Sequence, residues 1–555
     1  MILEGIHAKQ KWDWVSTFHF KLKLFMKTIK FAFIVIAVIG MIAGLGCKKF
    51  LDQKPISAIP PESFWKDKND AKNWMAGIYN SLQTTLSASH LDWGEVRSDN
   101  LRVGGTGNAQ LTMITNTLSA NDADINSITT WTNLYVTISL CNYGIKYLPQ
   151  MIAQNVGGGA AEYREFLGQC YGLRALMYFY ALRVWGKVPI HTEPIESVNQ
   201  PLASPRSPIA DVKKRIQDDI VESLKTVGTT TTTMASTLAG TATSPKFYML
   251  KAAVYALQTD VCMWFQDYDG ALAASQNFIG LAGANSWVNN ITEWKNLFID
   301  PTNSPETVFN LFWSATERGG GVGVCSRLGS SSNTNNYEAT TEMYLALKNR
   351  VDPVTNKTID GRYWAYWDTV AMSTQQLYDD AVAQLGKFSA WRTVPGAAFT
   401  LQGNNDCEVK VPIYRYADIM LLRAEALNQK GQYQPALDIV NRVRSRVGYT
   451  VQAKLTDYTG DIKKGIELTI LKERQLELLG EGKRWFDLCR IDKTYDYTNA
   501  GYQYLRETMN PILATRTGAI QFQDIHMGRI LFPINSNMFN ANPKLKGDQN
   551  PPYDE

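Results

Sequence analysis

The sequence predicts a mainly α-helical protein that is built from pairs of packed helices. Apolar residues recur at helical spacing in several long stretches, and one stretch repeats that spacing on both sides of a glycine turn. Cysteines are scattered singly, without the spacing of a zinc site or a disulfide frame. The chain has 555 residues, of which 45% are hydrophobic, so it can bury a large core.

The clearest helix pair lies at 414–447. Its helical positions are Tyr416, Met420, Ala424 and Leu427, followed by Ala436, Val440, Val443 and Val447. Between the two runs, Gly431 permits a turn, Tyr433 can wedge between the helices, and Ala436 is small enough for close packing. This pattern is typical of a tetratricopeptide unit, a helix pair that buries one face on its neighbours.

Other stretches extend the helical scaffold. The segment 251–279 repeats the Tyr-x-x-Ala-Leu step of the first pair, beginning at Tyr268. Helical spacing also appears at 127–148 and 161–185. We therefore expect tetratricopeptide-like helix pairs to form the scaffold.

Two segments interrupt the helical pattern. The stretch 228–244 is rich in Thr, Gly and Ser and predicts a loop between helical blocks. From about 284 to 407 the period breaks into a Gly- and Asn-rich stretch and the aromatic sequence RYWAYW at 362–367, which we expect to be non-helical. Long irregular insertions of this kind are usually functional when they carry aromatics. We therefore expect long irregular loop insertions that form a ligand surface.

The first 46 residues read as an upstream extension followed by an export signal. Lys27 and Lys30 precede an apolar run, 31–43, of signal-peptide length that is too short for a membrane span. Small and apolar residues then lead to Cys47, as in the lipobox of bacterial lipoproteins, so we expect Cys47 to be lipidated and Met26 to be the true start. The alternative is an ordinary cleaved signal, and whether 1–25 are translated stays open.

The charge balance argues against a nucleic-acid partner. Residues 1–46 carry six Lys or Arg and two acids, so from residue 47 onward the stated totals of 56 and 52 become 50 of each. A neutral chain offers no broad basic surface to nucleic acid. Widely spaced histidines and single cysteines indicate neither a metal site nor a cofactor.

Six segments, taken in order along the chain, resemble one protein family. They are CKKFLDQKP (47–55), FWKDKNDAKNWMAGIYNSLQ (64–83), EFLGQCYGLRALMYFYALRVWGKVPIHTEP (165–194), YRYADIMLLRAEALN (414–428), ILKERQLELLGEGKRWFDLCRI (470–491) and RILFPINSNMFNANPKLKGDQNPPY (529–553). Together they resemble the SusD/RagB group of outer-membrane lipoproteins of Bacteroidetes, over nearly the whole chain from Cys47. We therefore expect a single SusD-like domain at 47–555, with an N-terminal helical part at about 47–283, the irregular ligand-loop region at about 284–407 and a C-terminal helical part at about 408–555.

The resemblance implies a function as well as a fold. Family members bind ligands without catalysis and cover a SusC-like TonB-dependent transporter, to which they deliver oligosaccharides or, in some branches, peptides for import. It implies a lipid-anchored protein of the outer membrane that faces the cell exterior and needs no cofactor. The sequence leaves the glycan's identity, linkage and length open, together with the choice between glycan and peptide cargo.

Three groups of residues are candidates for contact with the ligand. Sugar rings stack on aromatic faces while their hydroxyls need polar partners, so aromatics among Asn, Asp and Arg indicate a binding surface. The groups are Trp93, Arg97, Asp99, Asn100 and Arg102; Trp313, Arg318 and Tyr337; and Trp364, Tyr366 and Trp367. The sequence does not decide which of them converge in space.

Two other groups of residues, both acidic, indicate a function only weakly. Glu473, Glu477 and Glu481 are spaced by four, so a carboxylate pair for glycoside hydrolysis is conceivable. We interpret them instead as ion-pair residues, since Arg474 and Arg484 are adjacent in sequence. Asp122 and Asp124 show alternating acidic spacing, but the loop lacks the glycine and terminal glutamate of a calcium-binding EF-hand. An enzyme and a purely structural helix-repeat adaptor stay as the rival functions.

Overall fold

The computed structural model describes residues 64–104, 107–196, 203–229, 245–311, 323–328, 337–367, 385–388, 390–391, 399–400, 410–493 and 501–553, with 325–326, 390–391 and 399–400 described by their backbone alone. The described chain is mainly helical, as the sequence predicts. Cys47, Trp313 and Arg318 lie outside the described residues, as do residues 230–244 of the predicted loop 228–244.

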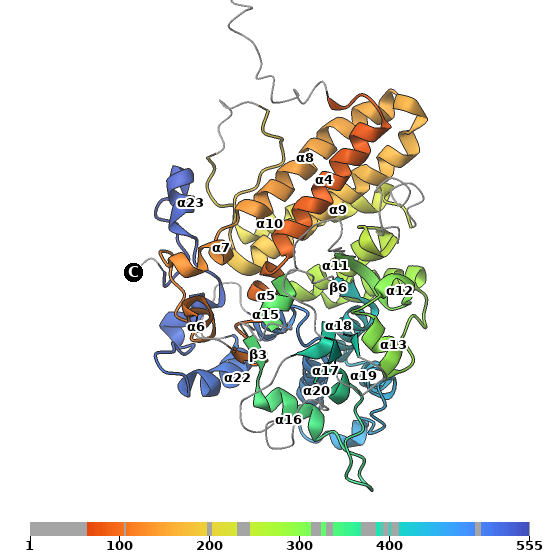
Figure 1. Ribbon diagram of the computed structural model, residues 1–555, viewed down its shortest axis with the longest axis vertical. Helices are drawn as coiled ribbons and strands as arrows, with labels where there is room; N and C mark the ends of the chain where they lie inside the picture. The colour runs from red at the N-terminus through yellow and green to blue at the C-terminus, as the bar shows by residue number, and fades with distance from the viewer. Residues whose placement is uncertain are drawn as a thin grey trace, which may run out of the picture. The chain divides into compact units, whose positions relative to one another are not determined.

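Four long helices pack side by side in the N-terminal half (Figure 1). They are α4 (Lys68–Leu86), α8 (Thr132–Ala153), α9 (Ala160–Trp185) and α10 (Ile209–Thr226). Helix α8 contacts α4 and α9, and α10 packs against α9. Arg174 of α9 forms a buried two-bonded ion pair with Asp219 of α10, with nitrogen–oxygen distances of 2.8 and 2.7 Å.

Both predicted tetratricopeptide-like helix pairs are confirmed. The first comprises α11 (Lys251–Trp264) and α12 (Tyr268–Ala282), and the second comprises α18 (Tyr416–Gln429) and α19 (Tyr433–Ser445). Helix α12 packs against α18, which joins the two pairs. Gly431 adopts a φ of +74° in the turn of the second pair, a conformation that suits glycine because it has no Cβ.

The C-terminal part adds α20 (Ile462–Glu477), α21 (Arg484–Arg490) and α22 (Gln503–Ala514). Short α-helices connect the long ones: α5 (Ser89–Gly94), α6 (Asn108–Ile114), α7 (Asn126–Thr129), α13 (Ile291–Asn296), α15 (Gly323–Leu328), α16 (Thr341–Lys348), α17 (Arg362–Tyr366) and α23 (Ser536–Ala541). The 3-10 turns are η1 (Ala123–Ile125), η2 (Val156–Gly158), η4 (Pro245–Phe247), η5 (Pro301–Asn303), η6 (Gly386–Phe388), η7 (Leu455–Asp457), η8 (Asp524–Ile530) and η9 (Pro543–Leu545). No described helix has the length and hydropathy of a membrane span.

Within the described ranges, six short strands pair into three antiparallel ladders. Strand β1 (Leu101–Val103) pairs with β3 (Tyr337–Ala339), β2 (Thr307–Leu311) with β6 (Val411–Arg415), and β4 (Ala390–Trp391) with β5 (Phe399–Thr400). The first ladder connects two segments that are more than 230 residues apart in sequence. It therefore positions an insertion on the helical scaffold.

The aromatic segment 362–367 differs from its expected structure. Residues Arg362–Tyr366 form the helix α17, whereas the sequence led us to expect a non-helical segment. Five residues carry too short a periodic pattern to distinguish one helical turn from a loop. The described chain from Trp65 onward forms one compact unit, in which β2 and β6 pair across the expected boundary at 407/408.

Candidate ligand-binding site

Two of the predicted ligand segments are held together by the β1–β3 ladder. The register places Arg102 opposite Glu338 and Val103 opposite Tyr337. The Arg102 guanidinium lies 3.1 Å from the Glu338 carboxylate, and the two side chains keep 26% and 16% of their surface exposed. The ladder therefore brings the 92–105 segment beside the segment that contains Tyr337.

Helix α16 links this ladder to the third predicted group. The backbone N–H of Thr340, directly before α16, donates to the carbonyl of Asn100 at 2.9 Å. Further along α16, the hydroxyls of Tyr344 and Tyr363 lie 2.6 Å apart, and the Tyr344 ring packs edge-on against Trp367 at 5.3 Å. Parts of all three predicted groups thus lie around α16, namely residues 100–102, Tyr337 and the segment 363–367. Trp93 and Arg97 pack elsewhere.

The aromatic residues of the third group differ in exposure. Tyr366 is fully buried and Trp367 is 1% exposed. The Tyr366 hydroxyl donates to the carbonyl of Leu476 at 2.7 Å, and its ring packs edge-on against Trp294. The structure corrects the expectation for Tyr366 and Trp367, because a buried ring has no face to offer a ligand. Trp364 is partly exposed.

Most of the first group also lies in the core. Trp93 is buried and donates its indole N–H to the carbonyl of Ile128 at 2.9 Å. The buried Arg97 guanidinium lies 4.3 Å from the centre of the Trp485 ring. Asn100 is buried and donates to Glu95 at 2.7 Å. The structure therefore corrects the expectation of ligand contact for Trp93, Arg97 and Asn100.

Two further predicted residues are occupied by protein partners. Tyr337 is only 2% exposed, so its ring also packs in the core and the expected ligand contact is corrected. Asp99 keeps 12% of its side chain exposed, but both of its carboxylate oxygens accept from Arg484, at 2.8 and 2.9 Å. Among the predicted residues that the structure describes, Asp99, Arg102 and Trp364 are partly exposed and the others are buried.

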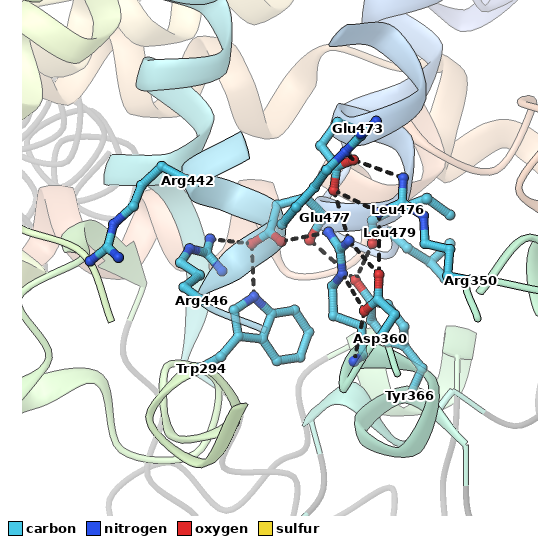
Figure 2. Close-up of polar contacts among 12 residues, drawn as sticks. Trp294, Arg350, Asp360, Tyr366, Arg442, Arg446, Glu473, Leu476, Glu477 and Leu479 are labelled. Carbon is cyan, nitrogen blue, oxygen red and sulfur yellow. Dashed lines mark hydrogen bonds and ion pairs between the residues drawn. The ribbon is translucent and has the colours of Figure 1, made fainter. Parts of the chain in front are cut away.

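A buried network of charges lies beneath this region (Figure 2). Glu477 of α20 accepts from the Trp294 indole and from three guanidinium groups, at 2.7 to 2.9 Å. The three arginines are Arg362, Arg415 and Arg446. One turn earlier, Glu473 accepts from Arg350 at 2.8 Å and from Arg362 at 2.7 Å. Arg362 thus ties α17 to both carboxylates of α20.

The electrostatics of this network match a structural role. Burial by itself would raise the pKa of the Glu473 carboxyl, but Arg350, Arg362 and Arg444 hold that pKa well below its usual value. The pKa of Glu477 is likewise lowered by its arginine partners against the effect of burial. A general acid needs a raised pKa and access to the substrate, and these carboxyls have neither.

The ion-pair interpretation of the glutamates is confirmed, but the expected partners were wrong. Arg474 pairs with Asp487 and Asp418, and Arg484 pairs with Asp99. Because Arg474 directly follows Glu473 on one helix, their side chains point about 100° apart. The actual partners come from segments distant in sequence.

Two buried lysines, which sequence reasoning missed, fasten residues 385–388 to the scaffold. The Lys295 ammonium donates to the carbonyls of Ala365, Gly386 and Lys387. Lys387 in turn lies 2.5 Å from the Glu481 carboxylate and 4.4 Å from the centre of the Phe298 ring. Burial lowers the pKa of Lys387 to about 8, although Glu481 acts to raise it. No sequence pattern indicates such lysines, because their partners are mostly backbone carbonyls.

The geometry does not support the hypothesis that calcium binds at Asp122 and Asp124. One carboxylate oxygen of Asp122 accepts from the backbone N–H of Asp124 at 2.9 Å, which makes Asp122 the cap of η1. In the described ranges, no three His, Cys, Asp or Glu side chains form a group that could hold a metal ion.

Comparisons with known proteins agree with the fold. Residues 306–553 match the model of the SusD family, and residues 49–249 match a model described as "Starch-binding associating with outer membrane". SusD-like protein P38 of Formosa agariphila is 26% identical, over 95% of this chain and 99% of its own.

Solved structures give the same fold. A SusD superfamily protein from Bacteroides thetaiotaomicron superposes with a TM-score of 0.65 at 18% identity, covering 88% of this chain and 99% of that protein. NanU of B. fragilis superposes with a TM-score of 0.61 at 23% identity, covering 90% and 99%. With the two family models matching different halves, this chain is a member of the SusD/RagB family, the non-catalytic sugar-binding proteins associated with the outer membrane.

Proposed function

We propose that this protein captures oligosaccharides at the bacterial surface and delivers them to a SusC-like TonB-dependent transporter. The observation that supports the proposal is that Arg102, Tyr337 and the segment 363–367, one part of each predicted group, lie around α16 on a scaffold that belongs to a sugar-binding family. In this proposal Cys47 carries the lipid that holds the protein on the exterior of the outer membrane.

Two side chains in this region have the chemistry that a sugar requires. The partly exposed Trp364 ring offers an apolar face for the C–H groups of a pyranose, and its neighbour Tyr363 packs against it edge-on at 5.3 Å. The Arg102–Glu338 pair offers donors and acceptors for hydroxyl groups. The buried rings and the charge network below supply a rigid base, so binding requires little ordering of the protein.

The test is isothermal titration of the chain from residue 48 onward against plant, host and microbial oligosaccharides, followed by analysis of reducing ends. Trp364→Ala is expected to weaken binding of the best oligosaccharide about fivefold to tenfold, since a lost stacking contact is worth about 1 to 1.5 kcal/mol. Its melting temperature should fall by no more than about 3 °C, because the residue is only partly buried against the core.

A matched control is Tyr433→Ala, which removes a partly exposed aromatic ring at the turn between α18 and α19. This variant should bind as the wild type does. Equal weakening in both variants would contradict the placement of the site. If no oligosaccharide of the panel binds, the proposed cargo becomes a peptide. If new reducing ends form, the protein is an enzyme.

A further inference from the structure

A polar pocket of about 220 Å³ lies where α18, α20 and the end of α21 meet, and we call it the α18 pocket. Glu425 and Gln429 line it from α18, because residues four positions apart share one face of a helix. Glu467 of α20 and Arg490 of α21 also line it. None of the predicted ligand residues that the structure describes lines this pocket.

The junction of α11 and α12 and the residues after α21 complete the α18 pocket. Met263, Gln266 and Tyr268 come from the junction, and Ile491 and Asp492 follow α21. Helix α18 packs against α11, α12 and α20, which holds these segments together (Figure 1). Of the nine lining residues, only Met263 and Ile491 have apolar side chains. The lining therefore suits a polar ligand better than an apolar one.

One buried carboxylate oxygen in the α18 pocket lacks a hydrogen-bond donor. Glu425 is 2% exposed, and its Oε1 accepts from the Arg490 guanidinium, which also donates to Asp487 at 3.0 Å. Glu425 Oε2 has no hydrogen-bond partner among the described residues. Burial raises the pKa of the Glu425 carboxyl, although Arg490 acts to lower it. A buried charged acceptor without a donor is costly, so a donor that enters the pocket is bound favourably.

The charge of the lining favours a cation as that donor. Glu425, Glu467 and Asp492 place three carboxylates in the lining, against the single guanidinium of Arg490. The two oxygens of Glu467 accept from Gln429 at 2.6 Å and from Lys464 at 2.9 Å. An ammonium group, which carries a positive charge and up to three N–H donors, matches this set of acceptors.

Two nearby lysines balance the carboxylates only in part. Lys464 lies 2.9 Å from Glu467 and 3.7 Å from Asp492, but its side chain is 40% exposed, so solvent screens its charge. Lys493 is buried, and burial lowers its pKa well below the usual value. In the described ranges, no three His, Cys, Asp or Glu side chains form a group that could hold a metal ion. The cation that fits is therefore an organic ammonium.

The volume and the polar lining indicate the rest of the ligand. The pocket volume of about 220 Å³ is roughly seven times the share of one water molecule in the liquid, so a small organic molecule fits. Drug-sized ligands occupy larger pockets, of about 300 to 1,000 Å³. The amide oxygen of Gln429 can accept from a hydroxyl group. A monosaccharide with a protonated amine combines the required size, charge and hydroxyl groups.

We propose that the α18 pocket binds a small amino sugar, with Glu425 and Glu467 accepting from its ammonium and Gln429 from a hydroxyl. This inference goes beyond the proposed function, because the pocket takes a monosaccharide and is lined by neither Arg102 nor Trp364. Its failure would leave the oligosaccharide titration unaffected.

The test is isothermal titration of the chain from residue 48 onward with glucosamine, glucose and n-butylamine at millimolar concentrations and pH 6.5. Glucose lacks the amine, and n-butylamine lacks the hydroxyls. Glucosamine is expected to bind at least tenfold more tightly than either of the other probes. If glucosamine does not bind, the proposal is overturned and water is the donor to Glu425. Equal binding of glucose overturns the ammonium site, and equal binding of n-butylamine overturns the amino-sugar class.

Two variants and two controls locate the bound amine. Glu425→Gln and Glu467→Gln each keep the shape of the side chain and remove a carboxylate, so each is expected to weaken glucosamine binding at least tenfold. Glu222→Gln on α10 and Trp364→Ala should bind glucosamine as the wild type does. Equal binding by all four variants overturns the pocket, and a loss in Trp364→Ala alone places glucosamine at the proposed oligosaccharide site instead. Glu467→Gln carries the test if Glu425→Gln lowers the melting temperature, since the Lys464 partner of Glu467 is 40% exposed.

Discussion

Replacing Glu477 with glutamine tests whether the buried charge network holds the ligand region to the scaffold. The wild-type carboxylate sits among Arg362, Arg415 and Arg446, and all four side chains are at most 2% exposed. Glutamine keeps the shape of the side chain but removes its negative charge, so the three buried guanidinium groups lose part of the charge that balances them. Breaking a buried ion pair of this kind destabilises a protein by about 3 to 5 kcal/mol.

The expected change in melting temperature follows from the size of the unit. Unfolding entropy is about 2.1 cal/mol/K per residue, so the 491 residues from Trp65 to Glu555 give about 1 kcal/mol/K. A loss of about 3 to 5 kcal/mol then lowers the melting temperature by about 3 to 5 °C. Thermal and urea unfolding, followed by circular dichroism, measure both quantities.

Glu222→Gln is the matched control for this substitution. Glu222 pairs with Lys225 at 2.6 Å, but the side chains are 42% and 58% exposed, so the change should alter stability by less than about 1 kcal/mol.

The pH dependence of stability gives a second test of Glu477. The folded pKa of Glu477 is depressed, so its contribution is present above pH 4.5 and declines as the pH falls further. The difference between the wild type and Glu477→Gln should narrow below that pH. If Glu477→Gln loses no more stability than the control, the network does not hold the region together.

Two further predictions concern the turn beneath the first predicted group. Gly482→Ala should lower the unfolding free energy by about 2 to 4 kcal/mol in urea, because φ is +69° and a Cβ would lie 2.5 Å from the His90 carbonyl. Gly518→Ala, with a similar φ of +74° and nothing within 4 Å of its Cβ, should lose only about 1 kcal/mol, and equal losses would contradict the steric argument. Burial lowers the pKa of His90 from 6.5 to about 4, so the folded state keeps this ring neutral. The free energy of unfolding should therefore decline by about 3 kcal/mol as the pH falls from 6.5 to about 4, because the unfolded chain takes up the proton first. His90→Gln should flatten that decline, and an unchanged pH profile would refute the assignment.

The helix pairs could be predicted because their signal is local. Apolar positions before and after Gly431 repeat with the helical period, and the structure places helices α18 and α19 over those positions. The ionic role of Glu473 and Glu477 was also predictable, since such carboxylates at helical spacing share one face. Their partners were not predictable, because Arg350 and Arg362 lie more than 100 residues away in sequence.

The exposure of the aromatic residues in the candidate site could not be predicted from the sequence. Trp364 and Trp367 are three positions apart and have the same chemistry, yet Trp364 is partly exposed and Trp367 is buried against Tyr344 of α16. The difference depends on which face of a single helical turn meets α16. That orientation comes from the packing of α17 against α13 and α16.

By itself the sequence determined the mainly α class, the helix pairs and the family resemblance. These follow from periodicity and ordered motifs, which are properties of neighbouring residues. Only the tertiary structure decided which aromatic rings stay exposed and which charges pair. Burial is a property of contacts between distant segments, such as that of Tyr366 with Leu476, and no local pattern records those contacts.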